Sequence, residues 1–193
     1  AAPARQTPRT RRVWGTSNEA AIRAGWSCVK LLEGIAEIDD LQGFLDGVDD
    51  IAAKHGCTVQ AFDANYVVGT DHLRRAVELA DRAIQRDEAV ARERGVEILL
   101  YAGGCRQIDR ALEMGVAEGE VPVVVLIDRP TSSVRATLES PPGCEDDRAV
   151  EDTEGGESDP ESAAADAVAE LLRPTSTLGE YDPERVCSFF DIT

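Results

Sequence analysis

The chain has 193 residues, of which 37 are acidic and 20 are basic, so its formal net charge is −17. Hydrophobic residues make up 42% of it, which is enough for the core of one domain and argues against a wholly disordered chain. Its longest uncharged apolar runs fall far short of the ~20 residues that a membrane span needs, and no secretory pattern opens the chain. We therefore expect a soluble, cytoplasmic protein with no membrane partner.

The composition is typical of a solvent adaptation. Only Lys30 and Lys54 are lysines, the other basic residues are arginines, and aromatic residues make up 5% of the chain. At molar salt the Debye length falls to about 3 Å, so a dense carboxylate surface repels itself little and keeps the protein hydrated. We interpret the charge as halophilic; an acidic surface built for a basic partner is the alternative. In either case a nucleic-acid site would be a local arginine patch.

The first segment differs from the rest of the chain. Residues 1–25 contain five arginines against a single acid, Glu19, and show no hydrophobic periodicity. We interpret them as a disordered extension or an over-called start site, with a nucleic-acid-binding arm as the functional alternative. The folded domain is then expected over residues 26–193.

Strand and helix patterns alternate at the start of this domain. Residues 28–35 form a short apolar run that predicts a strand. The helix predicted next is capped by Asp39, carries apolar residues at helical spacing and ends at Gly56. Residues 57–62 predict a second strand.

The following elements include a second amphipathic helix and a central strand. Asp71 is the predicted cap of the helix. The segment Glu97–Gly115 also has a helical apolar face, but Gly103 and Gly104 interrupt it. Because two glycines cost about 2 kcal/mol in a helix interior, we expect two short helices there. Residues 121–128 are nearly continuous in β-branched residues, a pattern typical of a buried central strand.

The last part of the chain combines a loop with two helices. Residues 139–159 are acidic and rich in glycine and proline, which predicts a flexible loop. Asp159–Pro160 and Asp182–Pro183 each predict a helix start. The last helix carries Val186 and two phenylalanines on one face, and these are expected to dock on the body. The predicted fold is α/β (α+β type): a single domain with a small central sheet flanked by helices and the C-terminal helices packed on it.

No pattern of an assembled active site is present. His72 has Asp63 and Asp71 nearby in sequence, but a histidine in the first turn of a helix is expected to face solvent. The five cysteines are too widely spaced for a zinc or redox motif, and His55 is the only other histidine. We therefore predict free or buried thiols, and neither a metal nor a cofactor.

Arginines supply the candidate binding residues. Arg75, Arg82 and Arg86 are predicted to form one stripe on the exposed side of the second helix. The structural alternative is that Glu78 and Asp81 neutralise them through pairs within the helix, each worth a few tenths of a kcal/mol.

Arg106 is the sharper candidate because it lies just after the two glycines, with only Cys105 between them. It is expected near the start of a helix over Gln107–Met114, where backbone N–H groups favour an anion. Tyr101 could then stack on a nucleotide end. The candidate RNA-binding residues are Arg106, Gln107, Tyr101, Arg75, Arg82 and Arg86.

Three stretches of the sequence resemble one family. FDANYVVGTDHLRRAVELADRA (Phe62–Ala83) and VEILLYAGGCRQIDRALEMGV (Val96–Val116) resemble the tRNA-binding accessory subunits of the KEOPS complex, the family of the PRPK-binding protein. The terminal segment Tyr181–Asp191 resembles haloarchaeal members of that family. The similarity covers residues 27–128 and 160–192. The arginine-rich start and the acidic loop have no counterpart in it.

The resemblance implies a non-enzymatic subunit. KEOPS makes threonylcarbamoyl-adenosine next to the anticodon of tRNA. A member of this family binds the kinase/ATPase subunit and through it the catalytic threonylcarbamoyl-transferase subunit; archaeal members also bind the tRNA 3′ CCA end. Placing Arg106 and the arginine stripe at the RNA is our own inference. Two alternatives remain: a purely protein-binding regulator of a kinase-like partner, and a small RNA-processing enzyme that uses His72 with Asp63 or Asp71.

Overall fold

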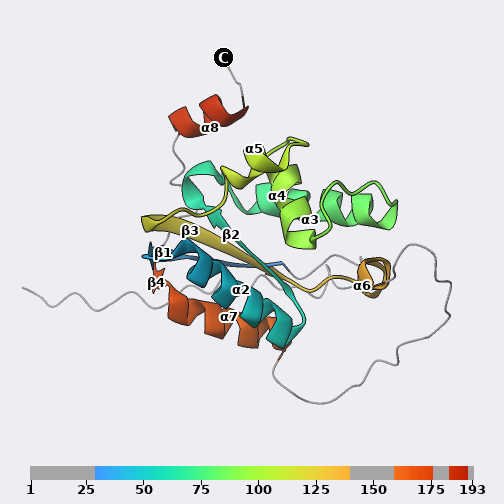
Figure 1. Ribbon diagram of the computed structural model, residues 1–193, viewed down its shortest axis with the longest axis horizontal. Coiled ribbons are helices and arrows are strands. Elements are labelled where there is room, and N and C mark those ends of the chain that lie inside the picture. Colours follow the sequence, from blue (N-terminus) through green and yellow to red (C-terminus); the bar gives the residue numbers. More distant parts are fainter. Residues whose placement is uncertain (1–28, 140–158, 176–182, 191–193) are drawn as a thin grey trace, which may run out of the picture.

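The computed structural model describes residues 29–139, 159–175 and 183–190 (Figure 1). In these residues a four-stranded antiparallel sheet has the order β2–β3–β1–β4. The strands are β1 (Lys30–Ile38), β2 (Thr58–Asp63), β3 (Gly119–Asp128) and β4 (Arg173–Pro174). The helices are α2 (Leu41–His55), the 3₁₀ turn η1 (Ala64–Tyr66), α3 (Thr70–Gln85), α4 (Arg94–Ala102), α5 (Ile108–Leu112), α6 (Ser132–Glu139), α7 (Pro160–Leu171) and α8 (Pro183–Phe190). The predicted α/β class, a small sheet flanked by helices in a single body, is confirmed.

Strand β3 is the centre of the sheet, as its β-branched run predicts. Its residue Ile127 pairs with Lys30 of β1 on one side and with Val59 of β2 on the other. Residues 123–128 are all buried. An antiparallel strand is buried on both faces only when both faces of the sheet are covered, so helices must lie above and below it.

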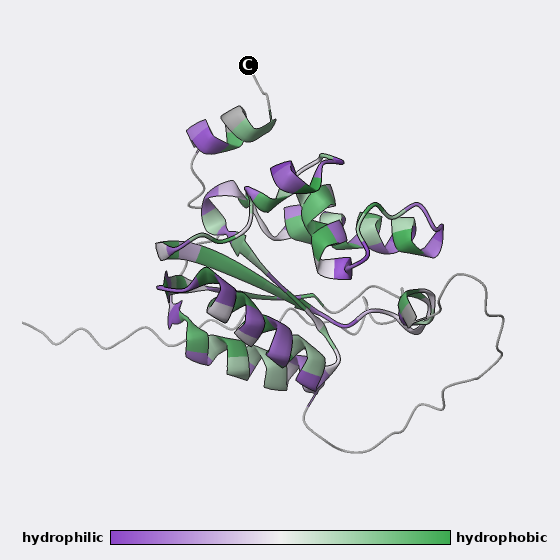
Figure 2. Cartoon of the chain, in the orientation of Figure 1, coloured by the Kyte–Doolittle hydropathy of each residue, from purple (hydrophilic) through white to green (hydrophobic). Residues whose placement is uncertain are grey.

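Two helical layers provide this cover (Figure 1). Val124 and Leu126 of β3 belong to a core that also contains residues of α3, α4 and α5, which we call the upper core. Val123, Val125 and Ile127 belong to a second core with residues of α2 and α7, the lower core. Figure 2 shows β3 as a hydrophobic strand between these layers. The alternation of strand side chains thus distributes one apolar run over two cores.

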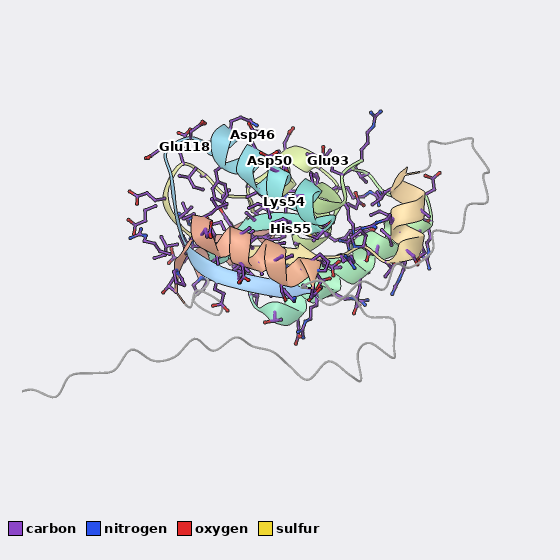
Figure 3. All side chains as sticks on the ribbon, turned by 90° about the horizontal axis from the view of Figure 1, so that it is seen from below. Asp46, Asp50, Lys54, His55, Glu93 and Glu118 are labelled. Atoms are coloured by element: carbon purple, nitrogen blue, oxygen red, sulfur yellow. The ribbon has the colours of Figure 1, made fainter. Side chains whose placement is uncertain are left out.

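The lower layer has an acidic outer surface. Asp46, Asp50 and Lys54 follow one another along the exposed side of α2 (Figure 3).

The helix α2 is capped by Asp40, whose side chain accepts from the Gln42 N–H, and not by Asp39 as predicted. The prediction was wrong by one residue because either aspartate fits the pattern and only the backbone conformation decides between them.

Several elements differ from the prediction. The first strand begins at Lys30 and ends at Ile38, later than the predicted range 28–35. The helix α6, the turn η1 and the two-residue strand β4 were not predicted. Strand β4 pairs with Gly34 and Ile35 of β1, and a Cβ atom on Gly34 would lie 2.8 Å from the Arg173 carbonyl oxygen. Its position therefore depends on a close approach between distant segments that no local pattern contains.

The upper helices begin and end differently from expectation. α3 begins at Thr70 with Gly69 as its cap residue, so Asp71 is not the predicted cap and lies in the first turn. The expected break at the two glycines is confirmed, because α4 ends at Ala102 and Gly104 has a left-handed φ of 58°. The helix after the break is shorter than predicted and covers only Ile108–Leu112.

A buried ion cluster joins four of the elements. The Arg94 guanidinium donates to both Asp81 carboxylate oxygens at 2.7 and 3.0 Å, to the Thr58 hydroxyl at 3.0 Å and to the Asp128 carboxylate. Its side chain is 3% exposed. Burial by itself would lower the pKa of Arg94, but the hydrogen bond to Asp81 and the charge of Asp128 raise it above its ordinary value. The cluster ties α3, α4, β2 and β3 together.

Of the remaining predictions, those on the helices α7 and α8 can be compared with the structure, and those on residues outside the described ranges cannot. The helix α7 starts with Asp159 as cap residue and Pro160 in the first turn, as predicted. In α8, Val186 and Phe189 are buried, which confirms that this helix docks on the body. The predicted extension 1–25, residues 140–158 of the predicted acidic loop and the cap residue Asp182 lie outside the described residues.

Candidate functional site

The three stretches that carry the family resemblance meet at one place. The His72 Nε2 atom, at the start of α3, lies 2.9 Å from the Ala102 carbonyl oxygen at the end of α4. From α8, the Phe190 ring lies 6.2 Å from the His72 ring, and the Phe189 ring lies 5.4 Å from that of Tyr66. Segments far apart in sequence therefore form one junction.

This junction is hollowed on one side. An open groove of about 770 Å³, which we call the junction groove, lies between η1, α5 and α8. Its lining residues are Tyr66, Gln107, Asp109, Arg110, Glu113, Glu184, Arg185 and Phe189. They mix carboxylates, arginines, an amide and two aromatic rings, so the groove offers hydrogen bonds and apolar contact without a strong single-sign charge.

Both arginines in the groove contact neighbouring elements. The Arg110 guanidinium lies 5.6 Å from the centroid of the Phe189 ring and donates to the Phe189 carbonyl oxygen. The Arg185 Nη1 atom of α8 lies 3.3 Å from the Asp63 carboxylate at the end of β2. These two contacts hold α8 against the body.

One residue of the predicted RNA-binding set, Gln107, belongs to the lining of this groove. The adjacent Arg106 is exposed and has no ion pair within the part of the chain that the structure describes. Tyr101 is half-buried and packs against the upper core. The predicted anion site at a helix start is not supported, because α5 has only five residues and its dipole is correspondingly small.

The arginine stripe on α3 is exposed as predicted. Of the two acidic residues expected to neutralise it, Glu78 does so and Asp81 does not. Arg75 donates to Glu78 at 2.7 Å. Asp81, expected on the surface as a second neutralising partner, is buried and bound to Arg94. The second part of the predicted neutralisation was wrong, because α4 packs against α3 on that side.

The stripe also leads away from the junction. His72 marks the end of α3 that lies in the junction, and at 1.5 Å per residue Arg82 and Arg86 lie about 15 and about 21 Å further along the helix axis. The structure therefore does not bring these two arginines to the groove. Arg75 lies within one turn of His72.

His72 is not the solvent-facing residue that its position in the first turn predicted. It is half-buried, because α8 covers it. The contact of Nε2 with a carbonyl oxygen requires that Nε2 carry the proton, and its buried Nδ1 has no hydrogen-bond partner among the described residues.

The proposed carboxylate partners of His72 are engaged elsewhere. The Asp63 carboxylate accepts from the Asn65 N–H and from Arg185. Asp71 is fully exposed beside Arg74. Within the described residues the structure therefore does not assemble a histidine–carboxylate pair at His72.

A second polar cluster lies on the lower layer. Lys30 of β1 donates to Asp159 at 2.6 Å and to Ser162 at 2.7 Å, which fastens the start of α7 to the sheet. Partial burial alone would raise the pKa of Asp159, but Lys30 outweighs it and lowers this pKa. The neighbouring Glu161 is buried, and burial together with the charges of Asp159 and Asp128 raises its pKa. This cluster is an anchor for α7.

Two described cysteines agree with the predicted thiols. Cys57 is buried and Cys105 half-buried, and both are free. Burial raises the pKa of the Cys57 thiol. Among the described residues, no group of three or more His, Cys, Asp and Glu side chains could hold a metal ion, and no helix is long and apolar enough to cross a membrane.

Two comparisons with known proteins were negative. No protein-family model matches the chain, and no curated protein matches it significantly. The resemblance to the KEOPS accessory subunits therefore depends on the quoted motifs and on their convergence in space.

Proposed function

We propose that this protein is a tRNA-binding accessory subunit of the KEOPS complex. In this role it binds the kinase/ATPase subunit and the 3′ CCA end of tRNA, and so recruits the substrate for threonylcarbamoylation near the anticodon. One observation supports the proposal above the others: the three stretches that resemble the family converge on the junction groove. The kinase contact is proposed from the resemblance alone.

The chemistry at the groove edge suits a single-stranded RNA end. The Gln107 amide has both a donor and an acceptor for a base edge, and the Arg106 guanidinium is planar and can stack on a base or bind a phosphate.

Molar salt favours this kind of recognition. Affinity from phosphate contacts falls steeply as salt rises, whereas stacking and base-edge hydrogen bonds depend on it less. Beside Gln107, the side chain of Ile108 is 40% exposed and that of Leu112 53%. These apolar side chains provide a surface on which an unstacked base can lie without ionic contacts.

The test is tRNA binding in molar KCl, with intact transcripts and with transcripts that lack the terminal CCA. We expect the protein to bind the intact transcript more tightly. Arg106→Glu should weaken that binding by about tenfold to a hundredfold, as loss of a direct nucleotide contact does, with an unchanged melting temperature. Arg86→Glu is the matched control, because it makes the same charge change at an exposed site, the residue that caps the far end of α3.

Other outcomes of the binding assay would change the proposed RNA site or the proposed function. Equal binding of both transcripts would indicate a nonspecific arginine contact, and a larger loss in Arg86→Glu than in Arg106→Glu would move the RNA to the stripe. No binding of either transcript, with stimulation of the kinase ATPase, would favour a purely protein-binding regulator.

A further inference from the structure

The phenylalanines of α8 sit against the two glycines that precede Arg106. The Phe189 side chain is buried, and a Cβ atom on Gly103 would lie 3.3 Å from its Cζ atom. A Cβ atom on Gly104 would lie 3.8 Å from the Phe190 Cε1 atom. The absence of a side chain at Gly103 thus allows the Phe189 ring to approach the backbone of the turn, whereas the Phe190 contact at Gly104 is of ordinary van der Waals length.

The same phenylalanine also contacts the far side of the turn. Arg110, in α5, donates to the Phe189 carbonyl oxygen and places its guanidinium over the Phe189 ring. Residues 104–109 therefore lie between two points, Gly103 and Arg110, that are both in contact with Phe189. The segment that carries Arg106 and Gln107 is therefore flanked by two contacts with Phe189, one to its ring at Gly103 and one to its ring and backbone carbonyl at Arg110.

Backbone hydrogen bonds also shape the turn: the Gly103 N–H donates to the Leu99 carbonyl at 2.9 Å and the Gly104 N–H to the Tyr101 carbonyl at 3.2 Å. The Cys105 N–H donates to the Leu100 carbonyl at 3.1 Å, and the Cys105 Sγ atom lies 3.7 Å from the Gln107 carbonyl oxygen. α5 has five residues, far fewer than the ~12–15 that an isolated helix needs for stability. Its geometry must therefore come from packing, and α8 supplies the contacts on the side of the groove.

We propose that Phe189 is a positioning residue for the RNA site. It fixes the turn from Gly103 to Arg110, so that Arg106 and Gln107 are held ready for the single-stranded RNA end. The inference rests on the proposed function. It assigns to α8 a role in RNA affinity through the shape of the turn, in addition to its part in lining the groove.

The experiment compares Phe189→Ala with Phe44→Ala in the full chain. Phe44 packs in the lower core, on the other side of the sheet, so its loss removes the same atoms without touching the turn. Each variant is assayed for binding of intact and CCA-trimmed tRNA at one KCl concentration, for its melting temperature, and for amide hydrogen exchange over residues 103–110.

For Phe189→Ala we expect faster exchange in residues 103–110 and binding of intact tRNA about tenfold weaker or more, so that preference over the trimmed transcript is reduced. Phe44→Ala should keep wild-type exchange in that segment and wild-type preference for the CCA end. Phe189→Met, which keeps most of the apolar volume, should restore most of the affinity. A purely structural role would not separate the two alanine variants in this way.

The failures are distinguishable. If the wild-type protein prefers the intact transcript and Phe189→Ala does so equally, with unchanged exchange over residues 103–110, the positioning role is overturned and the proposed function stands. If the wild-type protein shows no preference, the proposed function fails and the positioning role fails with it.

Discussion

The buried Arg94 cluster gives the sharpest test of the fold. Arg94→Met keeps an unbranched apolar stem but removes the guanidinium that the buried Asp81 and Asp128 carboxylates bind. Removing one member of a buried ion pair costs about 3–5 kcal/mol. For a chain of this size each kcal/mol shifts the melting temperature by about 2–4 °C, so we expect a loss of about 6–20 °C. Since a native protein has only about 5–15 kcal/mol in total, this loss is a large fraction of the stability of the protein.

The assay is thermal and urea unfolding of both proteins, followed by circular dichroism at two KCl concentrations. The matched control is Arg75→Met, because Arg75 pairs with Glu78 at 2.7 Å while both side chains are exposed. Such a pair contributes about 0–1 kcal/mol and is screened by salt. A loss below about 1 kcal/mol in Arg94→Met, or a loss as dependent on salt as that of the control, would refute the reasoning from burial.

Two further substitutions test the lower layer. Gly34→Ala should destabilise the protein by about 1–3 kcal/mol, because the added Cβ would lie 2.8 Å from the Arg173 carbonyl oxygen. Gly47→Ala in α2 should instead stabilise it by about 0.5–1 kcal/mol, because a Cβ atom there meets open space. The two effects are compared by the urea midpoints of unfolding. Because the pKa of Glu161 is raised in the folded chain, the folded state binds its proton more tightly, and stability falls as the pH rises above the ordinary value of 4.5. Glu161→Gln should therefore be more stable than the wild type at pH 7 and equal to it near pH 4, and equal stability at pH 7 would contradict the assigned cost of burying this charge.

The elements that the sequence predicts well are those whose signal is local. The β-branched run of β3, the apolar periodicity of α2 and the break at Gly103–Gly104 each depend on neighbouring residues and match the structure. Strand β4 has no such signal, since two residues become a strand only because Gly34 lets them approach β1. The cap at Asp40 also escaped prediction, because backbone dihedrals rather than composition choose between adjacent aspartates.

Contacts with distant elements set the burial and the pairing of the charged residues near the candidate site, and the sequence did not predict these contacts. Asp81 has the sequence context of a surface residue, yet α4 brings Arg94 against it and buries both. His72 has the context of an exposed first-turn residue, yet α8, more than a hundred residues later, covers its ring. Helical spacing gives the face of a residue on its own helix, and it contains no information on which distant element packs there.

The segment from Gly103 to Arg110 contains residues that pack within the protein and one arginine that is exposed. Gly103 is small where the Phe189 ring approaches the backbone, and Gly104 has a left-handed φ of 58°, so the identity of both is explained by local structure. Arg110 is engaged with Phe189. Arg106, between them, is exposed and has no ion pair in the described part of the chain. The two glycines and Arg110 are explained by contacts within the protein, whereas Arg106 makes no such contact among the described residues. Arg106 and the adjoining edge of the groove are therefore the first place to look for a bound ligand.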